Sequence, residues 1–391
     1  MPRLAADPRH LFDSPRELLL ALRMSGAAPD EAIRVAAADP ERVLGSHIWL
    51  PGPITTTDPR ERQLRSAIEH TVGDDAMLRL VTQRKHMDAL GVRLWTLADW
   101  EELPILLRAG SHGAGMWWVW GDVAPEDRFA VAVAGSSRCT SYGKRQARRF
   151  GAAAAAHGLT VITGGERGVD HEATDAALEA GGRVIVVLGA GIEAHGRPHH
   201  EQYEQIVKQG RGAVISTSPL DAPPDPVNQV AGDFLVASLA IAVVVIEATA
   251  GSGAMIASRI FRDELERPVM AVPGPIDSPQ SEGVNSMIGA GNAELVSSTD
   301  EMLDRLVGHA RELDYRVSSG RVNARDFVRN GPLPRNLFRP KIDAVERSVL
   351  EAMDRSRDLA GLSEASGVDI ADVRKLMYRL YLAGVVDRRW S

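Results

Sequence analysis

Six short apolar segments, each bounded by turn residues, constrain the fold of this 391-residue chain more than any other feature. They span residues 129–135, 159–164, 183–189, 213–217, 241–247 and 267–274. Nearly every position in them is apolar, which is typical of strands buried on both faces, as in a parallel sheet. Helical patterns such as "GKRQARRFGAAAAAHG" and "GAMIASRIFRDELE" separate them. This alternation predicts βαβ units, and therefore an α/β fold with a doubly wound, mostly parallel sheet over residues 122–310.

Residues 1–121 form a separate region with short helical patterns, such as "DDAMLRLVTQRKHMDALG". We interpret them as a helical N-terminal region. Near its end, Trp117, Trp118 and Trp120 fall within four positions. We expect them to lie in a buried strand or a docking segment, which is a far commoner use of clustered tryptophans than an aromatic platform for nucleic acid.

Two further regions follow the predicted sheet. Residues 311–340 read as a linker rich in Arg, Pro and Gly. Residues 341–391 show a helix, the segment "LAGLSEASGVD" as a turn, a second helix from Asp369, and a short β element after Gly384. That outline is typical of a small winged-helix-like domain.

Charge is distributed unevenly along the chain. The whole sequence carries a formal net charge of −7, which argues against a generally basic coat for nucleic acid. The linker 311–340, however, holds seven arginines against three acidic residues. Such a cationic segment could contact a phosphate backbone, and a solvated linker explains it equally well.

The cellular compartment follows from cysteine content and from hydropathy. Cys139 is the single cysteine, so no disulfide framework can form within the chain. We find no apolar segment with the length of a signal peptide or of a membrane span. These features predict a cytoplasmic protein without a membrane partner.

Loops rich in glycine and small polar residues follow four of the predicted strands. They are "GSSRCTSYG" from Gly135, "TGGERGVD" from Thr163, "EATAGSG" from Glu247 and "PGPIDSPQSEGVN" from Pro273. In a doubly wound sheet such loops gather at the carboxyl edge, where ligands bind. Chain reversal alone can explain any one of them, whereas four on one edge favour a ligand that carries a phosphate.

Several enzyme classes are disfavoured. The G-x-G-x-x-G spacing and the G-x-x-x-x-G-K-[ST] motif are absent, which argues against NAD-dependent and ATP-hydrolysing enzymes. Cys139 follows Arg138 but has no evident partner base, so we interpret it as an incidental cysteine. His195, His199 and His200 lack acidic or cysteine partners at ligand spacing, and we expect a surface loop there. The sequence therefore predicts no catalytic residues, no metal and no cofactor.

The loop motifs together resemble the DprA/Smf family, the DNA-processing proteins of bacterial transformation. The likeness covers roughly residues 90–307 and includes "VAVAGSSRCTSYGKR", "EATAGSGAMIASRIF" and "AVPGPIDSPQSEGVNSMIGAGNAELV". It implies an extended Rossmann-like fold that binds single-stranded DNA through its phosphates and forms a homodimer. It also implies that the protein helps to load the RecA recombinase and is a binder and not an enzyme.

The resemblance also implies site residues. Arg167 is expected to contact phosphate directly, and Asp170 is expected to anchor the loop or to cap the following helix. The DNA- or phosphate-binding residues implied are Gly135, Ser136, Ser137, Arg138, Gly164, Gly165, Arg167, Gly168, Asp170, Gly251, Ser252, Gly253, Asp277, Gly283 and Asn285.

The sequence departs from the family pattern where positive charge is expected. Ser137 stands where the family has arginine, and Arg138 comes one position later. The family's Phe-Pro-Arg-Arg-Asn-Arg run is replaced by "QVAGDF", with Asp233 and without a cation. Glu282 occupies a position that is often basic in the family. We therefore expect weaker phosphate contacts.

Two alternatives to a DNA binder stay open. The missing arginine run suits a single nucleotide better than a polymer, which would make the protein a nucleotide sensor or a nucleoside-phosphate hydrolase. A scaffold that uses the C-terminal region as a protein-contact surface is the other alternative.

Overall fold

The structure of the protein is a computed structural model. It describes residues 74–96, 115–194, 197–318, 344–353 and 358–382, together with residues 19, 20, 22, 23, 99, 356 and 386.

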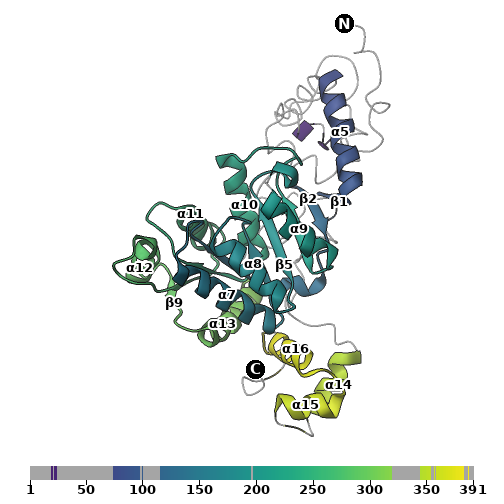
Figure 1. Ribbon diagram of the computed structural model, residues 1–391. Coiled ribbons are helices and arrows are strands. Elements are labelled where there is room, and N and C mark those ends of the chain that lie inside the picture. Colours follow the sequence, from purple (N-terminus) through teal and green to yellow (C-terminus); the bar gives the residue numbers. More distant parts are fainter. Residues whose placement is uncertain are drawn as a thin grey trace.

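A nine-stranded sheet forms the centre of the molecule, in the order β1-β2-β6-β5-β4-β3-β7-β8-β9 (Figure 1). All neighbouring pairs from β6 to β9 are parallel, and β1 and β2 extend the sheet as antiparallel strands. The strands are β1 Val92–Thr96, β2 Met116–Gly121, β3 Ala130–Gly135, β4 Thr160–Thr163, β5 Val184–Leu188, β6 Gly212–Ser216, β7 Ala242–Ile246, β8 Val269–Val272 and β9 Glu294–Leu295. The predicted α/β fold and its six buried strands are confirmed.

The order of the strands reverses beside β3. From β3 the chain adds β4, β5 and β6 on one side, and then returns to place β7 and β8 on the other. The loops that leave β3 and β7 therefore diverge to opposite sides, which opens a crevice at the carboxyl edge of the sheet. The four glycine-rich loops follow strands β4, β3, β7 and β8, which are neighbours in the sheet in that order.

Helices cover both faces of the sheet (Figure 1). Alternate residues of β3 face opposite ways: Val131 and Val133 join one core cluster, and Ala130 and Ala132 join the other. The first cluster contains side chains of α7 (Ser141–Ala156), α8 (Val169–Glu179), α9 (Arg197–Lys208) and α13 (Thr299–Ser318). The second contains those of α10 (Pro226–Leu239), α11 (Gly253–Arg259) and α12 (Glu282–Gly289). Two apolar layers thus bury the parallel strands, as their composition requires.

Short helical elements complete the sheet region. They are the 3₁₀ turns η4 Pro125–Arg128, η5 Ile192–Ala194 and η7 Pro279–Ser281, and the π-helical turn η6 Ile260–Glu264. The π turn interrupts the helix expected over 253–266 after Arg259. The predicted histidine loop is also wrong in part, because α9 begins at Arg197 and includes His199 and His200. His195 lies outside the described residues.

The tryptophan segment is the buried strand β2. Trp118 and Trp120 point into one core cluster and Trp117 into the other. β2 pairs with β6 on one side and with β1 on the other. Helix α5, Asp74–Leu90, runs directly into β1. The sheet therefore begins within the region 1–121.

Three helices follow in the C-terminal region: α14 Ala344–Ala352, α15 Leu359–Ser366 and α16 Ile370–Leu382. They share a small core with Val349, Leu362 and Leu376. The predicted turn "LAGLSEASGVD" is wrong, since it contains α15, whose end is the left-handed Gly367. The expected β element after Gly384 lies outside the described residues apart from Val386, so the winged helix and the domain boundaries stay predictions.

The linker arginines are only partly described. Arg311 and Arg316 belong to α13, which continues to Ser318. Arg316 bonds the main-chain oxygen of Glu266 at 2.8 Å, and the Arg311 guanidinium lies 5.6 Å from the centre of the Tyr381 ring. The other five arginines of 311–340 lie outside the described residues. Among the helices that the structure describes, none has the length and apolar character needed to cross a membrane.

Candidate ligand-binding cavity

A cavity of about 700 Å³ opens where the strand order reverses. It is bounded by the loops after β3, β4 and β7, by α10 and α11, and by Gln280 of η7. The residues that line it are Val133, Ala134, Gly135, Ser136, Ser137, Arg138, Gly164, Glu166, Asp170, Gln229, Asp233, Val236, Thr249, Ser252, Gly253, Ala254, Ala257, Phe261 and Gln280. This is the position at which doubly wound sheets bind ligands.

Two glycines allow the loops to meet at the cavity wall. A Cβ on Gly135 would lie 1.9 Å from the main-chain oxygen of Ile246, so only glycine lets β3 and β7 end this close together. Gly168 has φ +75°, and a Cβ there would lie 2.3 Å from the main-chain oxygen of Ser136. The Val169 N–H donates to that same oxygen at 3.2 Å. The β3 and β4 loops are therefore held together by main-chain contact.

Glu247, the residue after β7, fixes the start of α7. Its carboxylate accepts hydrogen bonds from the Thr140 main-chain N–H at 2.7 Å and from the Thr140 hydroxyl at 2.5 Å. Glu247 is 1% exposed and adopts φ 52°. The Tyr142 hydroxyl adds a 2.6 Å bond to the main-chain oxygen of Pro273. The sequence analysis missed this anchor, whose signal is a buried acid at the end of an apolar strand.

Three carboxylic acids line the cavity: Glu166, Asp170 and Asp233. Asp170 Oδ2 accepts from the main-chain N–H groups of Gly164 at 2.9 Å and Glu166 at 3.4 Å. Burial, reinforced by the charge of Glu166, raises the pKa of Asp170 to about 8. The same two causes raise the pKa of Asp233 to about 7. Acidic side chains therefore predominate over cations in the cavity lining. The glycine-rich loops and their arginines had instead predicted a site for phosphate.

Asp170 holds the loop after β4 in place. Its two main-chain hydrogen bonds reach back to the residues that follow Thr163. It does not cap α8, because the N-cap position is Gly168. Asp170 was expected either to anchor the loop or to cap the helix, and the structure shows it as the loop anchor.

Exposed arginines occur at the rim of the cavity, in the loop after β4 and on α7. Arg138 lines the cavity and is exposed. Arg167 is exposed as well but does not line the cavity. Arg145 and Arg149 are exposed on α7, one turn apart. None of these four guanidinium groups makes an ion pair within the part of the chain that the structure describes.

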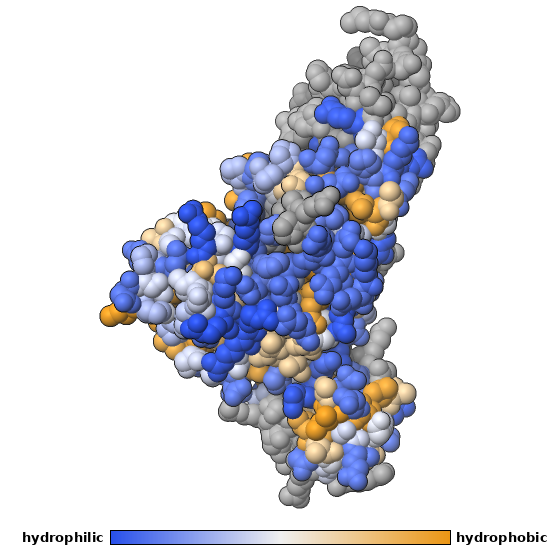
Figure 2. Space-filling model, in the orientation of Figure 1, coloured by the Kyte–Doolittle hydropathy of each residue, from blue (hydrophilic) through white to orange (hydrophobic). Residues whose placement is uncertain are grey.

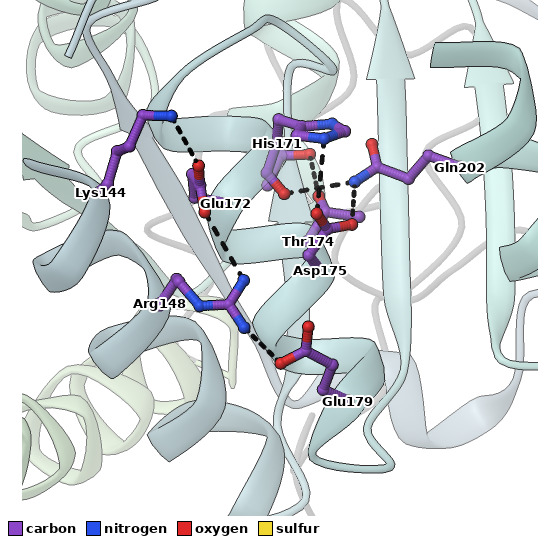
Figure 3. Close-up of polar contacts among 9 residues, drawn as sticks. Lys144, Arg148, His171, Glu172, Thr174, Asp175, Glu179 and Gln202 are labelled. Carbon is purple, nitrogen blue, oxygen red and sulfur yellow. Dashed lines mark hydrogen bonds and ion pairs between the residues drawn. The ribbon is translucent and has the colours of Figure 1, made fainter. Parts of the chain in front are cut away.

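Other charged residues of the same face are paired (Figure 3). Lys144 and Arg148 of α7 contact Glu172 of α8 at 3.1 Å and 3.5 Å, and Arg148 also pairs with Glu179. On the other side of α8, the Gln202 amide donates to Asp175 at 2.7 Å. The face over α7, α8 and α9 is largely hydrophilic (Figure 2). These pairs fix α8 against its neighbours.

The structure brings about half of the predicted site residues together. Eight line the cavity: Gly135, Ser136, Ser137, Arg138, Gly164, Asp170, Ser252 and Gly253. Seven do not: Gly165, Arg167, Gly168, Gly251, Asp277, Gly283 and Asn285. Asn285 instead exchanges two hydrogen bonds with the main chain of Gly274, at 3.2 Å and 3.1 Å. Gly283 lets α12 approach the main-chain oxygen of Ala248, which would lie 2.6 Å from a Cβ. The phosphate contacts of all fifteen stay predictions.

The histidines and the cysteine show no reactive arrangement in the described residues. The His200 ring stacks on Trp120 with 5.4 Å between centres, and His199 lies 6.1 Å from His171. No group of three or more metal-ligating side chains occurs in the described ranges. Burial and the nearby Glu247 raise the pKa of Cys139, which disfavours the thiolate that a nucleophile needs.

The chain is similar to known DNA-processing proteins. The family described as DNA recombination-mediator protein A matches residues 95–307. The protein Smf of Escherichia coli is 37% identical over 210 residues, which are 54% of this chain and 55% of that protein. The DNA processing protein DprA of Mycobacterium tuberculosis is 31% identical over 363 residues, 87% of each chain.

A solved structure shares the fold. It is DNA processing protein A of Streptococcus pneumoniae, with a TM-score of 0.56 and 21% identity, covering 73% of this chain and 95% of that one. The family match spans more than half of the chain, and the M. tuberculosis relative is matched over most of its length. The chain therefore belongs to the DprA/Smf family of DNA-processing proteins.

Proposed function

We propose that the protein binds single-stranded DNA and acts as a recombination mediator that helps to load the RecA recombinase. The observation that carries this proposal is the cavity at the strand-order reversal, with the exposed Arg138 at its rim, whose guanidinium makes no ion pair within the described residues. The family description, DNA recombination-mediator protein A, supports the same role. We propose further that the protein is a cytoplasmic homodimer and a binder without catalytic activity.

The arginines offer a path for the sugar-phosphate backbone. Arg138 lies at the cavity rim, and Arg145 and Arg149 are exposed on α7, the helix that follows the rim loop. Exposed, unpaired guanidinium groups release counterions when phosphate binds, which is the main source of affinity for nucleic acid. A single strand can lay its backbone over them and turn one base into the cavity, whereas a duplex keeps its bases stacked.

A titration with labelled oligo-dT, followed by fluorescence polarisation at several salt concentrations, tests this proposal. We expect binding at low salt, a marked fall in affinity with salt, and weaker binding of a matched duplex. Arg145→Gln with Arg149→Gln should lower the salt slope by ~1.4 units, since each of the two phosphate contacts to a single strand contributes ~0.7. Lys144→Gln with Arg148→Gln is the matched control, because those cations are paired with Glu172 and Glu179. A folded protein that leaves oligo-dT unbound at low salt would refute the proposal.

A nucleotide-binding function is the alternative, because the cavity of about 700 Å³ is large enough for a nucleotide and two of its carboxyl groups have raised pKa values. Such groups suit general acid–base chemistry, as in a nucleoside-phosphate hydrolase, or recognition by a nucleotide sensor. Thermal unfolding with a panel of nucleotides checks this alternative. A nucleotide that binds the folded state alone raises the unfolding temperature, and an unchanged temperature across the panel would exclude it.

A further inference from the structure

A second, smaller cavity lies at the opposite edge of the sheet from the first. It has a volume of about 160 Å³ and lies between α16 and the segments that lead into β3, β4 and β5. The two cavities share no lining residue, so the smaller one is a separate site. We call it the junction pocket and define it by six of the residues that line it: Glu126, Gly158, Gly182, Arg183, Lys375 and Arg379.

A glycine at the end of α7 lets α16 form one wall of the junction pocket. Gly158 has φ +74°, and a Cβ there would lie 2.8 Å from the Cβ of Lys375. Next to it, the His157 ring stands edge-on to the Tyr378 ring, with 5.3 Å between their centres. Lys375 and Arg379 are four residues apart on α16 and therefore share one face of the helix. Both side chains line the pocket.

Positive charge predominates in the lining of the junction pocket. Arg183, Lys375 and Arg379 stand against one acid, Glu126, which is exposed. The cations come from both walls, because Arg183 precedes β5 and the other two belong to α16. Arg183 already contacts both oxygens of Asp127 at 2.8 Å, which balances its charge. The excess of positive charge therefore comes from α16.

Arg379 is a cation without a counter-charge. Its Nε atom is buried without a hydrogen-bond partner, and no ion pair reaches its guanidinium group within the described ranges. Lys375 has a contact of 3.4 Å with the exposed Asp372. The Nε atom of Arg128 is buried without a partner as well. Burial lowers the pKa of Arg128 and the positive charge of Arg379 acts in the same direction, with Glu126 opposing both. Guanidinium groups that lack acceptors and repel one another are stabilised by an anion.

The size and the donors of the junction pocket select the kind of anion. Pockets for drug-sized ligands have volumes of about 300–1,000 Å³, so this one admits only a small anion or the end of a larger molecule. A phosphate group carries a charge of about −1.5 to −2 near pH 7, and its oxygens accept short hydrogen bonds from guanidinium and ammonium groups. It therefore matches both the charge and the donors of Lys375 and Arg379.

We propose that the junction pocket binds a small phosphate anion, either free phosphate or pyrophosphate or the phosphate tail of a nucleotide. Arg379 and Lys375 contact it from α16, and Arg183 contacts it from the opposite wall. The anion thus joins α16 to the sheet domain and acts as an effector that stabilises the docked position of this helix. The inference does not depend on the proposed binding of single-stranded DNA.

Thermal unfolding of the full-length protein tests the inference. The additives are phosphate, pyrophosphate, ATP and adenosine, each compared with sodium chloride at matched ionic strength. At ~100 times its Kd, pyrophosphate should raise the unfolding temperature by about 4 °C, and adenosine should leave it unchanged. A larger rise with ATP than with pyrophosphate identifies a nucleotide as the ligand, and an equal or smaller rise identifies the free anion.

Variants then locate the site. Arg379→Gln should weaken the binding of pyrophosphate about 10-fold or more, the ratio that corresponds to one hydrogen bond with a charged group. Arg374→Gln is the matched control, because Arg374 is an exposed arginine of the same helix that does not line the pocket. Arg138→Gln removes the cation at the rim of the larger cavity and should also leave the binding of pyrophosphate unchanged.

Three outcomes would overturn the inference. The first is an equal unfolding temperature of the wild-type protein in pyrophosphate and in matched sodium chloride, a comparison that needs no variant. The second is equal stabilisation of the wild-type protein and Arg379→Gln, since the anion would then bind elsewhere. The third is an equal loss of affinity in Arg374→Gln and Arg379→Gln, which would indicate a diffuse effect of the charge on α16. Each of them leaves the proposed binding of single-stranded DNA standing, because oligo-dT titration measures that separately.

Discussion

The phenol of Tyr378, on α16, donates a hydrogen bond of 2.7 Å to the main-chain oxygen of Leu303, on α13. Tyr378 and Leu382 are buried in the main core cluster, whereas Val373 and Leu376 of the same helix face the small C-terminal core. Helix α16 thus has two buried faces. α16 is the second helix of the helix-turn-helix outline predicted from the sequence, the helix that enters DNA in such motifs, and it packs against the sheet domain.

Tyr378→Phe is expected to weaken this junction. The substitution removes the donor of this hydrogen bond, while the Leu303 oxygen keeps its partner within α13, so we expect a loss of about 0.5–1.5 kcal/mol in free energy of unfolding. Urea unfolding measures the loss. Tyr381→Phe is the control, because its ring keeps the contact with Arg311 and no hydrogen bond of its hydroxyl occurs in the described residues. Equal stability of the two variants would contradict the role of Tyr378.

The Asp127 carboxylate is expected to contribute much more to stability than an exposed acid. Arg183 contacts both of its oxygens at 2.8 Å, and the Thr160 hydroxyl donates to it at 2.6 Å. The Asp127 side chain is 1% exposed. Asp127→Asn breaks a buried ion pair and should cost about 3 kcal/mol in free energy of unfolding. Asp263→Asn, which breaks the exposed pair with Arg262, should cost less than about 1 kcal/mol. Chemical denaturation of both variants compares them.

Stability should fall as pH rises from about 4 to about 8. The pKa of Asp170 is about 8 and that of Asp233 about 7 in the folded protein, each above the ordinary value of 3.8. The folded state therefore binds more protons than the unfolded state in this window, and each proton released costs folding free energy. The contribution is complete below pH 4 and is lost as pH passes the folded values. In Asp170→Asn the unfolding temperature should decline less between pH 5 and pH 8.5. An identical decline in wild type and variant would argue against the raised pKa.

Gly135→Ala should destabilise the protein, because the added Cβ would lie 1.9 Å from the Ile246 oxygen and force β3 away from β7. We expect a loss of about 1–3 kcal/mol, as for other overpacked sites. Gly253→Ala has no atom within 4 Å of its Cβ and should leave the unfolding temperature nearly unchanged. Differential scanning fluorimetry of the two variants tests the prediction, and a stable Gly135→Ala protein would contradict it.

Patterns that are local in sequence predicted most of the fold. The six parallel strands are uninterrupted apolar runs, and burial on both faces leaves little room for polar residues. Strand β1 was missed because the exposed Arg93 interrupts a run of only five residues, and β9 because it has two. Helix α15 was missed because Gly361 and Gly367 give its segment the composition of a turn.

The site was only half predictable because its chemistry depends on distant elements. Glycine spacing located the cavity edge correctly, since close approach of β3 and β7 requires Gly135. Glu166 and Asp170 stand in one loop, but Asp233 comes from α10, and only the fold brings all three into one space. From the sequence alone, Asp233 was only a negative charge in the segment that replaces the family's arginine run. That it turns inward and faces Glu166 follows from tertiary packing.

The pairing of β2 with β6 has a practical consequence for anyone who trims this protein. Residues 118–121 of β2 pair with residues 213–216 of β6, so a fragment that starts at the predicted boundary of 122 would uncover the β6 backbone. Uncovered strand edges recruit other chains. Such a fragment would oligomerise through an artificial seam, and a dimer observed with it would say nothing about how the full-length protein assembles.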